Sequence, residues 1–99
     1  MYKPIAIMKV EHKQNEGGGL FYIFENGSNV AEMEYNLKDE HTMVITHTEV
    51  DEAYRGRKLG EALVENGVEF ARSKQMKVLP LCTYAKAIIS KNDEMKDVL

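Results

Sequence analysis

The sequence predicts an α+β domain with a mixed, mostly antiparallel sheet of about five strands, a long crossover helix and a short C-terminal helix. Three features indicate this fold. Asn26-Gly27 is the dipeptide best suited to the positive φ angles of a tight hairpin turn. The run 42–50 is rich in β-branched residues, which favour strands. Residues 59–73 then repeat apolar side chains at helical spacing, so a long helix follows this strand.

Alternation of apolar and polar residues places the other strands. In 29–37, the apolar residues Ala31, Met33, Tyr35 and Leu37 alternate with mostly polar ones, so one face is buried and the other mostly wet. Segment 13–19 is polar and ends in consecutive glycines, and we expect a flexible, weakly ordered connection there. The predicted strands are 5–12, 20–25, 29–37, 42–50 and 76–82.

The connection between the last two strands sets the sheet topology. Two strands joined by a helix of this length normally run parallel, so 42–50 is expected to be a central strand of a mixed sheet. Pro80 cannot donate to a strand ladder, which indicates an edge strand or a bulge. Gly67 costs the helix up to ~1 kcal/mol relative to alanine, so it predicts close packing on the sheet. A second, shorter helix is expected over 84–90.

The composition limits the class of protein. The chain has 99 residues, of which 43% are apolar and 29% charged, and we expect a single domain over 1–99. Its net charge of −3 provides no global positive field for nucleic acid or an anionic membrane, so neither is an expected partner. No apolar stretch approaches the ~20 residues of a membrane span, and no signal-type run follows the start, so we expect a cytoplasmic protein.

The metal-ligating residue types are few. Cys82 is the single cysteine, so it cannot form an internal disulfide. The histidines are scattered among predicted strands at His12, His41 and His47. We therefore expect no metal site.

A turn dense in glycine and positive charge joins the strand 42–50 to the helix 59–73. Its residues 51–60 read Asp-Glu-Ala-Tyr-Arg-Gly-Arg-Lys-Leu-Gly. A helix opening leaves about four N–H groups without intrahelical partners and carries partial positive charge, so it attracts anions. Glycine and arginine at a helix start also serve capping and solubility, and spacing alone does not decide between these interpretations. The turn matches neither a nucleotide-triphosphate loop, since no Ser or Thr follows Lys58, nor a dinucleotide fingerprint.

Three short motifs occur in order along the chain: His47-Thr48-Glu49-Val50, Tyr54-Arg55-Gly56-Arg57-Lys58-Leu59-Gly60 and Pro80-Leu81-Cys82-Thr83-Tyr84. Together they resemble the GCN5-related N-acetyltransferase superfamily, in its very small branch marked by a Cys and Gly pattern. The resemblance spans nearly the whole chain and implies a truncated acyl-CoA N-acyltransferase fold. The superfamily's acetyl-CoA motif, Arg/Gln-x-x-Gly-x-Gly/Ala, maps onto residues 55–60, with Lys58 in place of a glycine.

The resemblance implies how acetyl-CoA would bind. Residues 55–60 would hold the pyrophosphate, and the end of the preceding strand would hydrogen-bond the pantetheine arm through its backbone. We expect Lys58 to keep a helical backbone amide and to add a charge for the phosphate. The implied cofactor-binding residues are Thr48, Glu49, Val50, Arg55, Gly56, Arg57, Lys58, Leu59 and Gly60.

Acetyl transfer to an amine requires a neutral nucleophile, a polarised thioester carbonyl and a proton donor for the departing thiolate. The resemblance makes Cys82 either an acyl-carrying nucleophile or a wall of the site, and as a nucleophile it must be a thiolate. Tyr84 resembles the superfamily's general acid, with a rim aromatic as the alternative. Glu49 is a base if its side chain points into the cleft, with His47 on the same strand face, and otherwise a solvated residue.

Two functions remain open at this point. The first is an acetyl-CoA-dependent N-acetyltransferase acting on an unidentified amine, either a small molecule or a protein amino group. The second is a CoA-binding regulatory or interaction module without significant catalysis. Larger superfamily members extend beyond the second helix, so we expect the acceptor side to be open, or completed by a large substrate or by the partner in a homodimer. Either a monomer or a homodimer fits the sequence.

Overall fold

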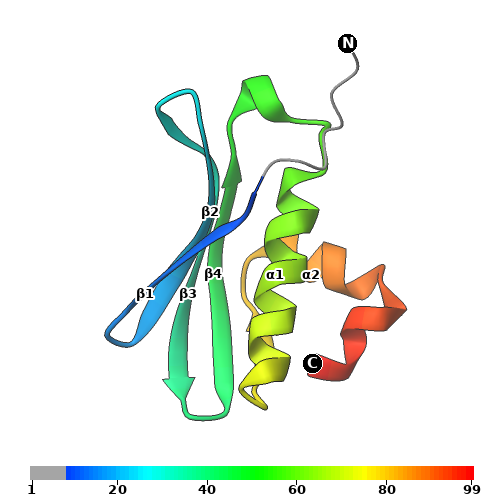
Figure 1. Ribbon diagram of the computed structural model, residues 1–99. Helices are drawn as coiled ribbons and strands as arrows, with labels where there is room; N and C mark the ends of the chain where they lie inside the picture. Colours follow the sequence, from blue (N-terminus) through cyan, green and yellow to red (C-terminus); the bar gives the residue numbers. More distant parts are fainter. Residues whose placement is uncertain (1–8) are drawn as a thin grey trace.

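The computed structural model describes residues 9–99. Its sheet has five strands in the spatial order β1-β2-β3-β4-β5, with helix α1 lying along the sheet (Figure 1). The strands are β1 (Glu11–Asn15), β2 (Gly18–Glu25), β3 (Ser28–Asp39), β4 (Thr42–Val50) and β5 (Lys77–Pro80). The helices are η2 (Glu52–Tyr54), α1 (Leu59–Ser73), α2 (Thr83–Ser90) and η3 (Asp93–Val98), where η denotes a 3₁₀-helix.

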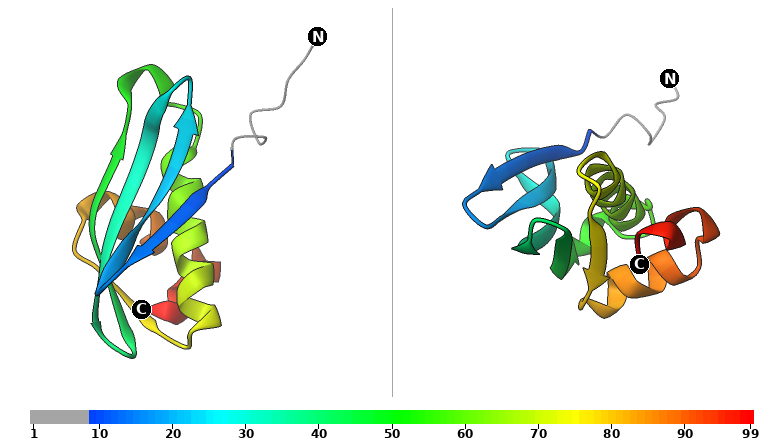
Figure 2. Two further views of the ribbon diagram at one scale, coloured as in Figure 1. Left: turned by 60° about the vertical axis from the view of Figure 1, so that its left-hand side comes forward. Right: turned by 90° about the horizontal axis from the view of Figure 1, so that it is seen from below.

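The sheet is mixed, as the sequence predicts. The pairings from β1 to β4 are antiparallel, and only β4 and β5 run parallel, with α1 as the connection between them. The core lies between the sheet and the helices, and α2 and η3 contribute buried residues on the side of α1 (Figure 2). The fold class and the α1 bounds are therefore confirmed, and β5 is an edge strand that ends at Pro80.

Two predictions that rest on glycines, the tight turn at Asn26-Gly27 and the close packing at Gly67, can be compared with the structure. Asn26 and Gly27 have φ angles of 51° and 85°, which confirms the tight turn between β2 and β3. A side chain on Gly67 would come within 2.6 Å of the Met33 Cε atom, so α1 approaches the sheet closely at this point. The predicted close packing at Gly67 is thus confirmed.

The prediction of a flexible connection over 13–19 is wrong. β1 runs to Asn15 and β2 begins at Gly18, so most of this segment belongs to the ladder. A Cβ on Gly18 would collide with the backbone carbonyl of Tyr35, and one on Gly19 would collide with the Tyr35 ring. These glycines are present because β3 approaches closely. The predicted strand 5–12 lies largely outside the described residues.

A bulge in β4 opens the sheet next to β5. Glu34 pairs with His47 and Tyr35 with Ile45, so Thr46 is the extra residue. β4 pairs with β5 only from Thr42 to Ile45, after which the two strands separate. The N–H groups of Leu81 and Cys82 both donate to the Ile45 carbonyl, where the chain turns away. On the side that faces away from β3, the second half of β4 therefore borders a gap rather than a neighbouring strand.

Candidate functional site

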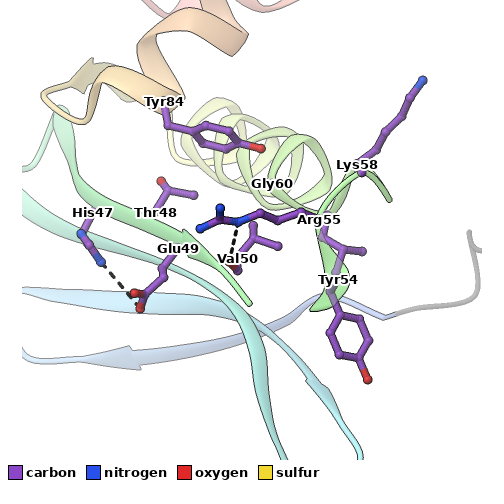
Figure 3. A pocket seen from close by; sticks show the side chains of 11 residues that line it. His47, Thr48, Glu49, Val50, Tyr54, Arg55, Lys58, Gly60 and Tyr84 are labelled. Carbon is purple, nitrogen blue, oxygen red and sulfur yellow. Dashed lines mark hydrogen bonds and ion pairs between the residues drawn. The ribbon is translucent and has the colours of Figure 1, made fainter. Parts of the chain in front are cut away.

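An open cleft of about 490 Å³ occupies the gap between the second half of β4 and the start of α1 (Figure 3). The loop between these elements closes one end, and α2 contributes one side chain from the other side of the gap. The lining residues are His47, Thr48, Glu49, Val50, Tyr54, Arg55, Gly56, Lys58, Leu59, Gly60 and Tyr84. All but three of these, His47, Tyr54 and Tyr84, belong to the cofactor-binding set implied by the family resemblance.

The edge of β4 presents backbone hydrogen-bonding groups to the cleft. The Asp51 N–H donates to the Val30 carbonyl, so this residue directs its peptide groups toward β3. Peptide groups alternate along a strand, and those of Thr48 and Val50 consequently point to the cleft side. The Val50 carbonyl accepts a 3.4 Å hydrogen bond from Arg55 Nε, which agrees with this orientation. An extended ligand could pair with this edge as an additional strand would.

The loop before α1 is held by two residues with positive φ angles. Gly56 has φ 85° and Lys58 has φ 62°, and Lys58 is the residue immediately before the first helical position. The expectation that Lys58 keeps a helical backbone amide is therefore wrong, because its backbone is left-handed. This conformation strongly favours glycine, which explains in physical terms why a glycine is usual at this motif position.

The cationic side chains of this loop point in different directions. Arg55 extends across the cleft between Tyr84 and Val50, whereas the Lys58 side chain points away from it (Figure 3). The Arg57 guanidinium lies 4.9 Å from the centre of the Tyr54 ring, and Arg57 does not line the cleft. In this conformation Arg55 is the loop cation best placed to meet an anion in the cleft.

Tyr84 covers the first turn of α1. A Cβ on Gly60 would collide with the Tyr84 ring and hydroxyl, so the absence of a side chain at Gly60 makes room for Tyr84. The residue remains 44% exposed. Burial raises the pKa of the Tyr84 hydroxyl above its ordinary value, with the nearby negative charge of Glu61 adding to the effect. The hydroxyl is therefore protonated at neutral pH.

Cys82 is not among the residues that line the cleft. It is half-buried and immediately precedes the first residue of α2. Burial opposes its ionisation, but donors near the thiolate outweigh this, and the pKa of Cys82 falls below its usual value. These donors are the Ala85 and Tyr84 N–H groups and the hydroxyl and N–H of Thr48. Within residues 9–99, the buried Thr48 hydroxyl makes no hydrogen bond while Cys82 is a neutral thiol, so it can donate to the thiolate once Cys82 ionises.

The residues arranged around this cleft match a known family. The family model described as GCN5-related N-acetyl-transferase matches residues 20–98, which include β4, the loop, α1 and Cys82. The chain belongs to the GCN5-related N-acetyl-transferase family. It is 31% identical over 86 residues to "Protein NATD1" of Danio rerio, covering 86% of this chain and 76% of that protein.

Solved structures with this family fold include relatives of similar and of larger size. A GCN5-like protein from Staphylococcus aureus is 33% identical, with a TM-score of 0.68 over 89% of this chain and 85% of its own. The ribosomal-protein-S18-alanine N-acetyltransferase from Escherichia coli is 19% identical, with a TM-score of 0.65. The match covers 79% of this chain but 53% of the Escherichia coli enzyme. A family member from Elizabethkingia anophelis with acetyl-CoA bound gives a TM-score of 0.58 at 20% identity, over 66% of this chain and 43% of its own.

In the present protein, a second hollow lies beside the cleft and is lined by acidic residues. It has a volume of about 370 Å³ and shares Glu49 with the first cleft. His47 and Glu49 lie 3.9 Å apart on one strand face, as their spacing predicts, and both are exposed. The carboxylates around the hollow are Glu32, Glu49, Asp51 and Glu52.

Sequence reasoning singles out only Glu49 of these carboxylates. The alternation in β3 does place Glu32 on the wet face, but the pairing of Glu32 with Glu49 depends on the register between β3 and β4. The bulge at Thr46 shifts that register, and no local pattern signals the bulge. Among residues 9–99 no group of three or more His, Cys, Asp or Glu side chains could hold a metal ion. The same residues contain no helix with the length and apolarity required to cross a bilayer.

Proposed function

We propose that the cleft binds acetyl-CoA and that the protein transfers the acetyl group to an amine. The observation that carries this proposal is the convergence of two features on one cleft. The free backbone edge of β4 can pair with the amide groups of a pantetheine arm. The glycine-containing loop and the first turn of α1 supply N–H groups and positive potential for a pyrophosphate.

Individual residues have distinct roles in this proposal. Thr48 and Val50 bind the pantetheine through their peptide groups, and a ligand carbonyl or amide displaces the Arg55 side chain from the Val50 carbonyl. Arg55 is then free to pair with a phosphate oxygen. Gly56 and Gly60 allow the backbone to approach the pyrophosphate. The Lys58 and Arg57 side chains have to turn toward the cleft to add their charge.

Tyr84 is the proposed general acid. Acetyl transfer expels a CoA thiolate, which takes up a proton as it leaves. The raised pKa of Tyr84 keeps its hydroxyl protonated, so the group is a donor at neutral pH. Glu49, which His47 approaches, is the proposed base that accepts the proton of the attacking amine, directly or through water. Both side chains line the same cleft.

Cys82 defines a two-step alternative within the same function. In that route the Cys82 thiolate attacks the thioester carbonyl, an S-acetyl bond forms and the CoA thiolate leaves with a proton from Tyr84. The amine then attacks the acetylated cysteine and restores the thiol. The lowered pKa of Cys82 supports this route, whereas the absence of Cys82 from the lining of the cleft supports direct attack by the amine.

The acidic hollow supports a cationic amine as the acceptor. Amines are mostly protonated in water, and the carboxylates around the hollow attract such a cation toward the cleft. A base is then required to generate the neutral nucleophile. Because the net charge of the chain is only −3, this attraction is local and depends on Glu32, Glu49, Asp51 and Glu52.

Thermal unfolding in the presence of acetyl-CoA tests the binding step. A ligand at one hundred times its dissociation constant stabilises the native state by about 2.7 kcal/mol, so the melting temperature should rise by several degrees. No shift at millimolar acetyl-CoA would refute the proposal. Release of free CoA in the presence of a panel of amines then tests transfer, and binding without amine-dependent release would favour the regulatory module.

Intact-mass measurement after incubation with acetyl-CoA separates the two chemical routes. The two-step route predicts an acetylated species in the wild type that Cys82→Ala does not form. Direct attack predicts amine-dependent CoA release by both proteins without a covalent species. Activity of Cys82→Ala equal to that of the wild type would remove the cysteine from the mechanism.

A further inference from the structure

The tip of the β2–β3 hairpin contacts the loop that precedes α1. Asn26 Nδ2 donates a 2.9 Å hydrogen bond to the Tyr54 hydroxyl, although the two residues are 28 positions apart in the sequence. Asn26 also occupies the left-handed position of the hairpin turn, with φ 51°. The turn thus sets the backbone position from which the Asn26 side chain reaches the Tyr54 hydroxyl.

Tyr54 transmits this contact to the cationic loop. Its ring packs against the edge of the core, and the guanidinium of Arg57 stacks 4.9 Å from the ring centre. Tyr54 also lines the cleft, and the next residue is Arg55, the cation that crosses it. A movement of the Tyr54 ring would therefore displace the loop from Arg55 to Lys58.

We propose that Asn26 is a positioning residue that sets the phosphate-binding loop through the Tyr54 ring and the Arg57 guanidinium stacked on it. The inference rests on the proposed binding of acetyl-CoA. The hairpin is held rigid by strand pairing that extends to Glu25 and Ser28, on either side of the turn, whereas the loop has left-handed residues at Gly56 and Lys58 and no strand pairing. The hydrogen bond restricts the loop before the ligand binds. Less conformational entropy is then lost when phosphates bind, and the affinity is higher.

Three substitutions isolate the contact. Asn26→Gly removes the amide but keeps a residue that favours the left-handed turn. Tyr54→Phe removes only the hydroxyl and retains the ring beneath Arg57. Asn26→Asp is the conservative rescue, since its carboxylate accepts a hydrogen bond from the Tyr54 hydroxyl and aspartate tolerates the turn. Ser28→Gly is the matched control, because it alters the same turn without removing the Asn26 amide.

NMR titration measures the affinity of each variant for two ligands. These are CoA and pantetheine, which lacks the phosphates. Loss of one neutral hydrogen bond is expected to weaken CoA binding by about threefold to tenfold in Asn26→Gly and Tyr54→Phe. Pantetheine affinity should stay unchanged in both, and Asn26→Asp and Ser28→Gly should bind CoA as the wild type does. A general loss of structure would weaken both ligands.

The outcomes separate the inference from the proposed function. If the wild type does not bind CoA, the proposed function fails. If the wild type binds and Asn26→Gly and Tyr54→Phe bind equally well, the positioning role of Asn26 is refuted. Equal loss of CoA and pantetheine affinity in these variants also refutes it, because the contact would then support the whole cleft rather than the phosphate-binding loop.

Discussion

The Tyr84 ring fills the space that a side chain at Gly60 would need. The two residues come from different motifs, one at the start of α1 and the other at the start of α2. Because Gly60 is buried beneath a half-exposed ring, its glycine identity serves the packing of Tyr84 as well as any approach of a ligand. The position of the proposed general acid thus depends on a glycine of the proposed pyrophosphate loop.

A double-mutant cycle at these positions should show strong coupling. Gly60→Ala forces Tyr84 outward, and we expect a loss of about 1 kcal/mol of unfolding free energy, since overpacking typically costs about 1–3 kcal/mol. In a Tyr84→Ala background the space is free, and the same substitution should stabilise the protein by up to about 1 kcal/mol through helix propensity. Denaturant unfolding of the four proteins measures the coupling. Equal effects in both backgrounds would contradict the packing described here.

Lys58 should carry backbone strain that glycine relieves. A left-handed conformation costs a non-glycine residue about 1–2 kcal/mol, while glycine adds about 0.5–1 kcal/mol of unfolded-state entropy. We therefore expect Lys58→Gly to raise the unfolding free energy by about 0.5–1 kcal/mol, or the melting temperature by a few degrees. Lys58→Ala, which loses the charge but keeps the strain, is the control and should change stability little. Equal stabilisation by both substitutions would trace the effect to charge rather than to φ.

The sequence predicts regular elements well where one local pattern is sufficient. The helix Leu59–Ser73 and the turn at Asn26-Gly27 depend on spacing and φ preference within a few residues, and both agree with the structure. The segment 13–19 is different, because two of its glycines leave room for the close approach of β3, which is distant in sequence. A glycine run looks the same whether it provides flexibility or makes room for a neighbour.

The same distinction applies to the cleft. Most of its lining residues can be read from contiguous motifs, including Arg55, Gly56, Gly60 and Tyr84. The left-handed backbone of Lys58 and the contact of Asn26 with Tyr54 cannot, since the first depends on the path of the loop and the second on the position of a hairpin 28 residues away. The acidic hollow likewise requires the β3–β4 register, which the bulge at Thr46 sets.

The glycines at the start of β2 should be unequal in their tolerance of alanine. Gly18→Ala places a Cβ against the Tyr35 carbonyl, and this backbone group cannot swing aside, so we expect a loss of about 2–3 kcal/mol. Gly17 faces open space and has φ 86°, so Gly17→Ala should cost only about 1 kcal/mol from the left-handed backbone. Thermal unfolding of the two variants decides this. Equal, small losses of stability in both variants would instead support the flexible connection predicted from the sequence.

The Cys82 thiol should ionise at a lower pH than an ordinary cysteine, and Thr48 should be part of the reason. Donors from Ala85, Tyr84 and Thr48 lower the pKa of Cys82 despite its burial. The rate of alkylation by iodoacetamide should therefore titrate with a midpoint below that of a cysteine without these donors. Thr48→Val removes the hydroxyl donor and should move the midpoint upward, whereas Thr46→Val, on the neighbouring bulge, should leave it in place.

The sign of the associated stability change provides an independent check. Because the pKa of Cys82 is lower in the folded than in the unfolded protein, the thiolate adds stability that is fully present above the unfolded pKa. That stability is lost as the pH falls through the folded pKa. The unfolding free energy of the wild type, relative to that of Cys82→Ala, should accordingly rise as the pH increases from the folded to the unfolded pKa. A flat difference together with an unshifted alkylation midpoint in Thr48→Val would show that the donors around Cys82 do not act on its ionisation.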